Sequence, residues 1–136
     1  MAGAPIDTLR RAPIFADLDD GELGEVALLF KERHFQAGET VVKEGADGAA
    51  FYLIESGNAT VSVRGTERAT LGAGDYFGEM ALIDEGVRSA TITASTDLIC
   101  YGLTLWEFKP LVVANGAIAW KLLQSLSKRL RSAEFG

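Results

Sequence analysis

Two glycines, a glutamate and an arginine in residues 77–92 could bind a ligand together. The chain there reads Phe-Gly-Glu-Met-Ala-Leu and, starting nine residues after the glutamate, Arg-Ser-Ala-Thr-Ile. A short helix that begins at Gly78 would turn unpaired N–H groups and the positive end of its dipole toward an anion. Arg88 adds a planar guanidinium, which matches two phosphate oxygens. The segment therefore predicts an anion site built on Gly78 and Arg88.

Glu79 does not suit an anion site unless it binds a different part of the same ligand. A carboxylate accepts hydrogen bonds from a sugar hydroxyl. Glu79 and Arg88 in one pocket would therefore recognise a sugar and a compact phosphate, which indicates a nucleotide. The competing interpretation is a plain structural ion pair between Glu79 and Arg88.

The elements that must position this segment follow from hydrophobic spacing and turn residues. Residues 5–34 favour helices with interruptions, because apolar side chains such as Leu23 and Val26 recur at near-helical spacing. From Phe35 onward, short runs rich in Val, Ile, Tyr and Thr alternate with glycine turns, which favours an antiparallel barrel or jelly roll. The runs are residues 40–43, 51–54, 59–63, 68–71, 89–94 and 98–103.

The chain after Tyr101 is predicted to be helical again. Pro110 is expected near a break, and Asn115-Gly116 is a turn signal between two helices. Trp120 and Leu123 are expected to pack between helices, with the alternative that one C-terminal apolar side chain covers a bound base.

These residues, in this order and spacing, resemble the cyclic nucleotide-binding domains of the catabolite activator protein, the regulatory subunit of protein kinase A and cyclic nucleotide-gated channels. Residues 77–82 and 88–92 resemble the phosphate-binding cassette of that family. The resemblance extends over about residues 15 to 130. Other matching stretches are residues 35–45, 51–57 and 71–77.

The resemblance implies an eight-stranded antiparallel jelly roll with N-terminal helices and a C-terminal helix. It assigns the ribose 2′-hydroxyl to Glu79, the cyclic phosphate to Arg88, and the other phosphate oxygens to the backbone amides of Ala81 and Ser89. The remaining candidate contacts are Gly78 and, in the apolar wall around base and sugar, Val61, Leu71, Met80, Ala90 and Ile92.

The chain departs from the family pattern in two places. Val87 stands where the family often has proline, and Gly48-Ala49-Ala50 stands where many members have Gly-Asp. Neither departure removes a side chain that is expected to contact the ligand.

We expect residues 1–136 to form one domain. Its parts are a helical part (5–34), a barrel (35–103) that contains the cassette (77–92), and C-terminal helices (104–133).

Composition and charge exclude several classes of function. The formal net charge of −6 argues against direct nucleic-acid binding, which needs a basic face. No apolar stretch approaches the roughly 18 residues of a membrane span, and a secretory pattern is absent at the N-terminus, so a cytoplasmic location is predicted. Cys100, the single cysteine, cannot form an internal disulfide and is expected to be a small buried hydrophobe. There is no Cys/His cluster, and therefore no metal signature.

The sequence thus predicts a sensor of cAMP that catalyses nothing. Ligand binding is expected to reposition the C-terminal helix over the base and to regulate an unknown protein partner or an attached output domain. The chain contains no recognisable output domain, which suits a stand-alone sensor or a fragment.

Three alternatives remain. Ser89 leaves a cGMP-selective sensor open, because a hydroxyl at that place contacts guanine in cGMP-selective members. A ligand-free protein interaction module with a degenerate cassette is the second alternative. A jelly-roll metal enzyme is the third and the weakest, because one histidine cannot build the usual metal site.

Overall fold

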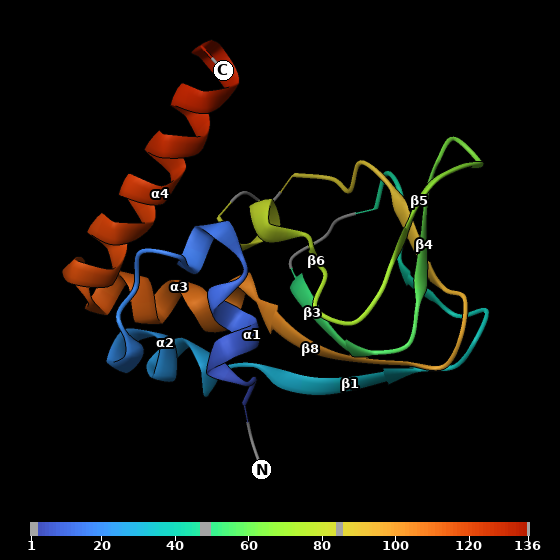
Figure 1. Ribbon diagram of the computed structural model, residues 1–136, viewed down its shortest axis with the longest axis horizontal. Helices are drawn as coiled ribbons and strands as arrows, with labels where there is room; N and C mark the ends of the chain where they lie inside the picture. The colour runs from blue at the N-terminus through green and yellow to red at the C-terminus, as the bar shows by residue number, and fades with distance from the viewer. Residues whose placement is uncertain (1–2, 47–49, 84–85, 136) are drawn as a thin grey trace.

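A computed structural model describes residues 3–46, 50–83 and 86–135, and of Met80, Ala81, Glu134 and Phe135 it describes the backbone alone. Gly48 and Ala49, part of one departure from the family pattern, lie outside the described residues. Helices gather at one end of the molecule and strands at the other (Figure 1). The N-terminal helices are α1 (Ile6–Arg10), η1 (Pro13–Phe15) and α2 (Asp20–Ala27), and the C-terminal helices are α3 (Leu105–Ala114) and α4 (Gly116–Phe135).

The strands form two four-stranded antiparallel sheets. One sheet has the order β1-β8-β3-β6, and the other has the order β2-β7-β4-β5. This arrangement confirms the predicted eight-stranded antiparallel jelly roll with flanking helices. The strands of the first sheet are β1 (Lys31–Phe35), β8 (Leu98–Thr104), β3 (Ala50–Ser56) and β6 (Tyr76–Phe77), and those of the second are β2 (Thr40–Val42), β7 (Thr91–Ala94), β4 (Ala59–Val63) and β5 (Thr66–Leu71).

Strand β1 corrects the expectation that residues 5–34 are helical. It begins at Lys31 and pairs with β8, from Lys31 opposite Gly102 to Phe35 opposite Leu98. Its first four residues are exposed and polar, so they carry no alternating hydrophobic signal. The strand therefore depends on pairing with β8, and the hydrophobic pattern of residues 31–35 alone could not predict it.

The C-terminal helices bring a second correction. Pro110 lies inside α3 and not at its end. The expected break is at Asn115, whose side chain Oδ1 accepts a hydrogen bond from the Ile118 N–H at the start of α4. A proline inside a helix lacks one hydrogen-bond donor. Pro110 is exposed here, so water can satisfy the carbonyl group that loses its donor.

Trp120 and Leu123 do not pack between helices as expected. They are 64% and 57% exposed, whereas Ile118 and Leu122 on another face of α4 are buried. Cys100 is completely buried, as predicted.

Strand β3 is buried on both faces and separates two hydrophobic cores. Phe51 and Leu53 belong to the core beneath the helices, whereas Tyr52 and Ile54 belong to the core between the two sheets. This division follows from the alternation of side chains along a strand. The Phe51 ring lies 5.8 Å from Phe15, 6.0 Å from Phe30 and 6.0 Å from Tyr76, measured between ring centroids. Phe51 therefore joins the helical layer to the sheet that carries the residues described next.

We expect Phe51→Ala to lower the free energy of unfolding by about 3–5 kcal/mol, because it removes a fully buried ring and leaves a cavity. Leu28→Ala, at a side chain that is 70% exposed, should stay within about 0.5 kcal/mol of the unchanged chain. Urea denaturation of both variants measures the difference. Equal effects would contradict the assignment of Phe51 to the core.

Candidate functional site

Gly78 permits a close packing that another residue would prevent. It follows β6 with a φ of 83°, a conformation that favours glycine. A Cβ atom at this position would lie 2.7 Å from the Ala50 carbonyl oxygen and would meet the Arg88 guanidinium. Gly78 thereby brings the start of the 3-10 helix η2 (Glu79–Leu82) against β3 and Arg88.

Arg88 is held at both its backbone and its side chain. Its N–H donates to the Ala46 carbonyl at 2.9 Å, and its carbonyl accepts from the Gly45 N–H at 2.8 Å. Its Nη2 donates to the Ala50 carbonyl oxygen. The expectation that Arg88 starts the next strand is wrong. Strand β7 begins three residues later, at Thr91.

The Arg88 guanidinium has a buried donor that is not used. Its Nε is buried and has no hydrogen-bond partner in the described structure. Burial also lowers the pKa of Arg88 from its ordinary value, because a buried cation loses hydration. An anion beside the guanidinium would compensate for the lost hydration.

Glu79 is buried and is bound to the C-terminal helix. Its Oε1 lies 2.8 Å from Arg129 Nη1 on α4, and its Oε2 is buried without a partner in the described structure. The neighbouring Tyr76 hydroxyl has a raised pKa, because of burial and then because of the Glu79 charge. The interpretation of Glu79 and Arg88 as a simple ion pair is therefore wrong: each has a different protein partner.

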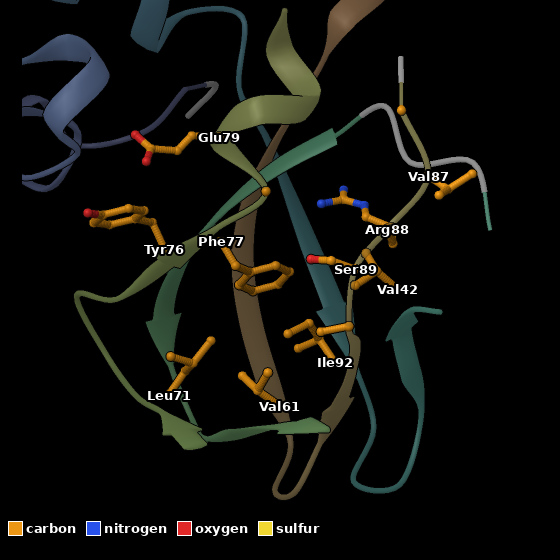
Figure 2. Close-up of a pocket in the computed structure, with 13 residues that line it drawn as sticks. Val42, Val61, Leu71, Tyr76, Phe77, Glu79, Val87, Arg88, Ser89 and Ile92 are labelled. Atoms are coloured by element: carbon orange, nitrogen blue, oxygen red, sulfur yellow. The ribbon is translucent and has the colours of Figure 1, made fainter. Parts of the chain in front are cut away.

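Both charged residues line one cavity of about 440 Å³. In Figure 2, Arg88 lies at the upper right and Glu79 at the upper left, and Val61 and Leu71 lie at the opposite end of the lining. Ser89 and Ile92 lie one below the other on the side of Arg88, and the ring of Phe77 faces Ser89. The complete lining is Val42, Val61, Leu71, Tyr76, Phe77, Gly78, Glu79, Gly86, Val87, Arg88, Ser89, Ala90 and Ile92.

The cavity brings together most of the residues singled out in the sequence. Those that line it are Val61, Leu71, Gly78, Glu79, Arg88, Ser89, Ala90 and Ile92. The side chains of Met80 and Ala81 lie outside what the structure describes. The roles of all these residues toward a ligand remain predictions.

The sequence did not single out several residues that line the cavity. For Phe77, the sequence contained a usable signal. Phe77 precedes Gly78 on a two-residue strand whose side chains alternate, so that Phe77 and Tyr76 belong to different cores. Phe77 stacks on Tyr52 with ring centroids 5.2 Å apart, which holds its ring in place. Val42 comes from β2, and neither its type nor its spacing distinguished it from other strand residues.

Arg129 was also missed as a partner of Glu79. Its signal is its place in the stripe Ile118, Leu122, Ser125 and Arg129, which follows the helical period. Ile118, Leu122 and Ser125 are buried. Arg129 continues the same face of α4, which brings it to Glu79.

This arrangement suits a ligand with three different parts. Arg88 can attract an anionic group, Glu79 can accept a hydrogen bond from a hydroxyl group, and a flat apolar ring fits the aliphatic end. No cluster of three or more His, Cys, Asp or Glu side chains that could hold a metal ion occurs in the part of the chain that the structure describes. Within the same part, no helix has the length and apolar character needed to cross a membrane.

Comparison with known proteins identifies the family. The family model described as “Cyclic nucleotide-binding domain” matches residues 32–115. The N-terminal domain of a transcriptional regulator from Streptomyces coelicolor A3(2) has a similar solved structure, with a TM-score of 0.87, 30% identity, and coverage of 94% of this chain and 93% of that one. The chain belongs to the cyclic nucleotide-binding domain family.

Two curated relatives are named for different cyclic nucleotides. A cAMP-dependent protein kinase regulatory subunit from Yarrowia lipolytica is 44% identical over 92 residues, which are 66% of this chain and 24% of the relative. A cGMP-dependent protein kinase from Eimeria tenella is 36% identical over 95 residues, 70% of this chain and 10% of the relative. The chain spans about a quarter, or less, of the length of such relatives.

We expect Gly78→Ala to destabilise the protein more than Gly38→Ala. Both glycines have a φ near 90°, but a Cβ at Gly38 would meet nothing within 4 Å. The backbone strain alone should cost about 1 kcal/mol at Gly38. At Gly78 the displaced Ala50 carbonyl and Arg88 should add about 1–3 kcal/mol. Chemical denaturation compares the two variants, and equal losses would show that Gly78 is not crowded.

Proposed function

We propose that this chain is a cAMP sensor that uses the cavity lined by Glu79 and Arg88 and catalyses no reaction. The observation that carries the proposal is a pair of buried polar atoms without partners, Arg88 Nε and Glu79 Oε2, on residues that line one cavity. Buried polar groups are almost always hydrogen-bonded, so a ligand in this cavity that reached both atoms through a shift of the two side chains would be stabilised by pairing them.

The phosphate of a cyclic nucleotide suits Arg88. It carries one negative charge, and its oxygens would accept from Nε and from a second guanidinium nitrogen once Nη2 leaves the Ala50 carbonyl. Charge-assisted hydrogen bonds of this kind are about twice as strong as neutral ones. The backbone amides of Ala81 and Ser89 are proposed as additional donors, and Gly78 is proposed as a further contact.

The sugar and base suit the rest of the cavity. The ribose 2′-hydroxyl would donate to Glu79 Oε2, and the base would lie against Val61, Leu71 and Ala90, with Met80 as a further contact. A volume of about 440 Å³ lies within the usual range for small-molecule sites.

The apolar end of the cavity favours adenine over guanine. Val42, Val61, Leu71 and Ile92 offer no side-chain hydrogen bonds there. Guanine would have to bury more polar atoms against them, and an unsatisfied buried polar group costs about 1–3 kcal/mol. One observation supports cGMP: Ser89, in the segment before β7, presents its hydroxyl on the cavity side (Figure 2), within the lining that a guanine amino group would meet.

We propose that ligand binding acts on other molecules through α4. A ligand shifts a conformational equilibrium only by its preference for one state. Helix α4 contacts the cavity wall through Glu79 and carries the exposed side chains Trp120, Leu123 and Leu130. A shift of α4 would move this surface and so signal to a protein partner or to an attached output domain.

Isothermal titration with cAMP and cGMP tests the proposal. We expect cAMP to bind more tightly, and we expect Arg88→Leu to weaken its binding by about 2–5 kcal/mol, because a desolvated charge contact is lost. Arg10→Leu is the matched control, since Arg10 pairs with Asp20 on the N-terminal helices away from the cavity. Absence of heat with either nucleotide at millimolar concentration would refute the proposal, and unchanged affinity in Arg88→Leu would refute the role of Arg88.

A further inference from the structure

Residues 88–90 separate from the neighbouring strand β4 at the wall of the cavity. The last pair in the ladder between β4 and β7 is Ser62 opposite Thr91. If the ladder continued by two residues in the same register, Arg64 would lie opposite Ser89. Ser89 lies instead in a bend before β7 and lines the cavity. A specific contact must therefore keep the two segments apart.

Glu44 binds both sides of this separation. Its backbone N–H donates to Thr91 Oγ1 at 3.0 Å, at the first residue of β7. Its side-chain Oε1 accepts a hydrogen bond from the Arg64 N–H at 2.8 Å, at the tip of the hairpin between β4 and β5. Glu44 follows β2, and β7 lies between β2 and β4 in the sheet. The side chain therefore reaches past the end of β7 to β4.

The two residues after Glu44 hold the other end of the bend. The Gly45 N–H donates to the Arg88 carbonyl at 2.8 Å, and the Arg88 N–H donates to the Ala46 carbonyl at 2.9 Å. Residues 44–46 thereby fix the chain at Arg88 and at Thr91, one on each side of the bend.

The hairpin tip contains a donor that benefits from a charged acceptor. Arg64 and Gly65 have φ values of 53° and 79°, the primed turn that favours residues such as Asn and Gly. An arginine in this conformation is strained, and a charge-assisted hydrogen bond to its N–H offsets part of that strain. The two strands of the hairpin carry Val61 and Leu71, which line the aliphatic end of the cavity. Glu44 thus connects this hairpin to the segment that carries Arg88.

We infer that Glu44 is a positioning residue that holds residues 88–90 apart from β4, so that Arg88 and Ser89 are kept at the cavity wall for the phosphate of the ligand. The inference rests on the proposed function, because it names the phosphate as the group that Arg88 binds. Glu44 is not one of the residues that line the cavity, so its effect on ligand binding passes through the residues it holds.

Titration calorimetry with cAMP compares three variants. We expect Glu44→Ala to weaken binding about fivefold, because the Arg64 N–H loses its acceptor and residues 88–90 lose their fixed position. Glu44→Gln keeps an acceptor oxygen and should stay within about twofold of the unchanged chain. Glu39→Ala is the matched control and should also stay within about twofold. Glu39 Oε1 likewise accepts from a backbone N–H, that of Gln36 at 2.9 Å, and Glu39 does not line the cavity.

Amide hydrogen exchange of the protein without ligand gives a second readout. We expect the Arg64 amide to exchange about tenfold faster in Glu44→Ala, because its hydrogen bond is lost. The Arg88 amide, which is bonded to Ala46, should also exchange about tenfold faster, because the segment that Glu44 holds becomes looser. Glu39→Ala should change neither amide.

Two results would overturn the inference by showing that Glu44 stabilises the hairpin tip alone. One is unchanged cAMP affinity in Glu44→Ala, and the other is faster exchange at Arg64 without faster exchange at Arg88. Equal losses of affinity in Glu44→Ala and Glu44→Gln would also overturn it, because the charge and not the hydrogen bond would then matter. If the unchanged chain binds no cyclic nucleotide, the proposed function fails, and exchange at Arg88 alone decides whether Glu44 positions this segment.

Discussion

The packing of Gly78 against Ala50 and Arg88 is the constraint on which the rest of the site depends. Gly78 adopts a positive φ and leaves no space for a Cβ atom, so β3, η2 and the guanidinium meet at one place. This contact places Arg88 at the cavity wall with its Nε buried and unpaired. It also sets the direction of η2, and with it the position of Glu79. Local backbone geometry thereby determines where both charges of the site are found.

The burial of β3 on both faces explains how a small domain can hold such a site. Phe51 anchors one face of the strand among aromatic rings of the helical layer, and Ile54 lies in the core between the sheets on the other face. The Ala50 carbonyl, which receives the Arg88 hydrogen bond, is at the start of this same strand. The residue that receives the Arg88 hydrogen bond and the two hydrophobic cores are therefore connected by one strand.

Local sequence predicted the elements that carry strong local signals. Glycine turns separated most of the strands, Asn115 marked the junction of α3 and α4, and the spacing of Gly78, Glu79 and Arg88 indicated a shared pocket. The features that depend on distant contacts were not predictable in this way. Strand β1 is polar and exists because it pairs with β8.

In helix α4, too, the sequence alone did not predict a feature that depends on distant contacts. Trp120 and Leu123 lie on one face of the helix, and Ile118 and Leu122 on another, so apolar spacing alone did not decide which face was buried. The structure buries the second face and leaves the first exposed. The contact of Arg129 with Glu79 follows from that choice, because both depend on how α4 docks against the N-terminal helices.

A crystal structure of the chain with bound cAMP tests the central claim most directly. We predict a phosphate oxygen within hydrogen-bond distance, roughly 2.7–3.2 Å, of Arg88 Nε and the ribose hydroxyl at Glu79 Oε2. A nucleotide bound elsewhere on the protein, or one in the cavity that leaves both of these atoms without a ligand contact, would contradict it.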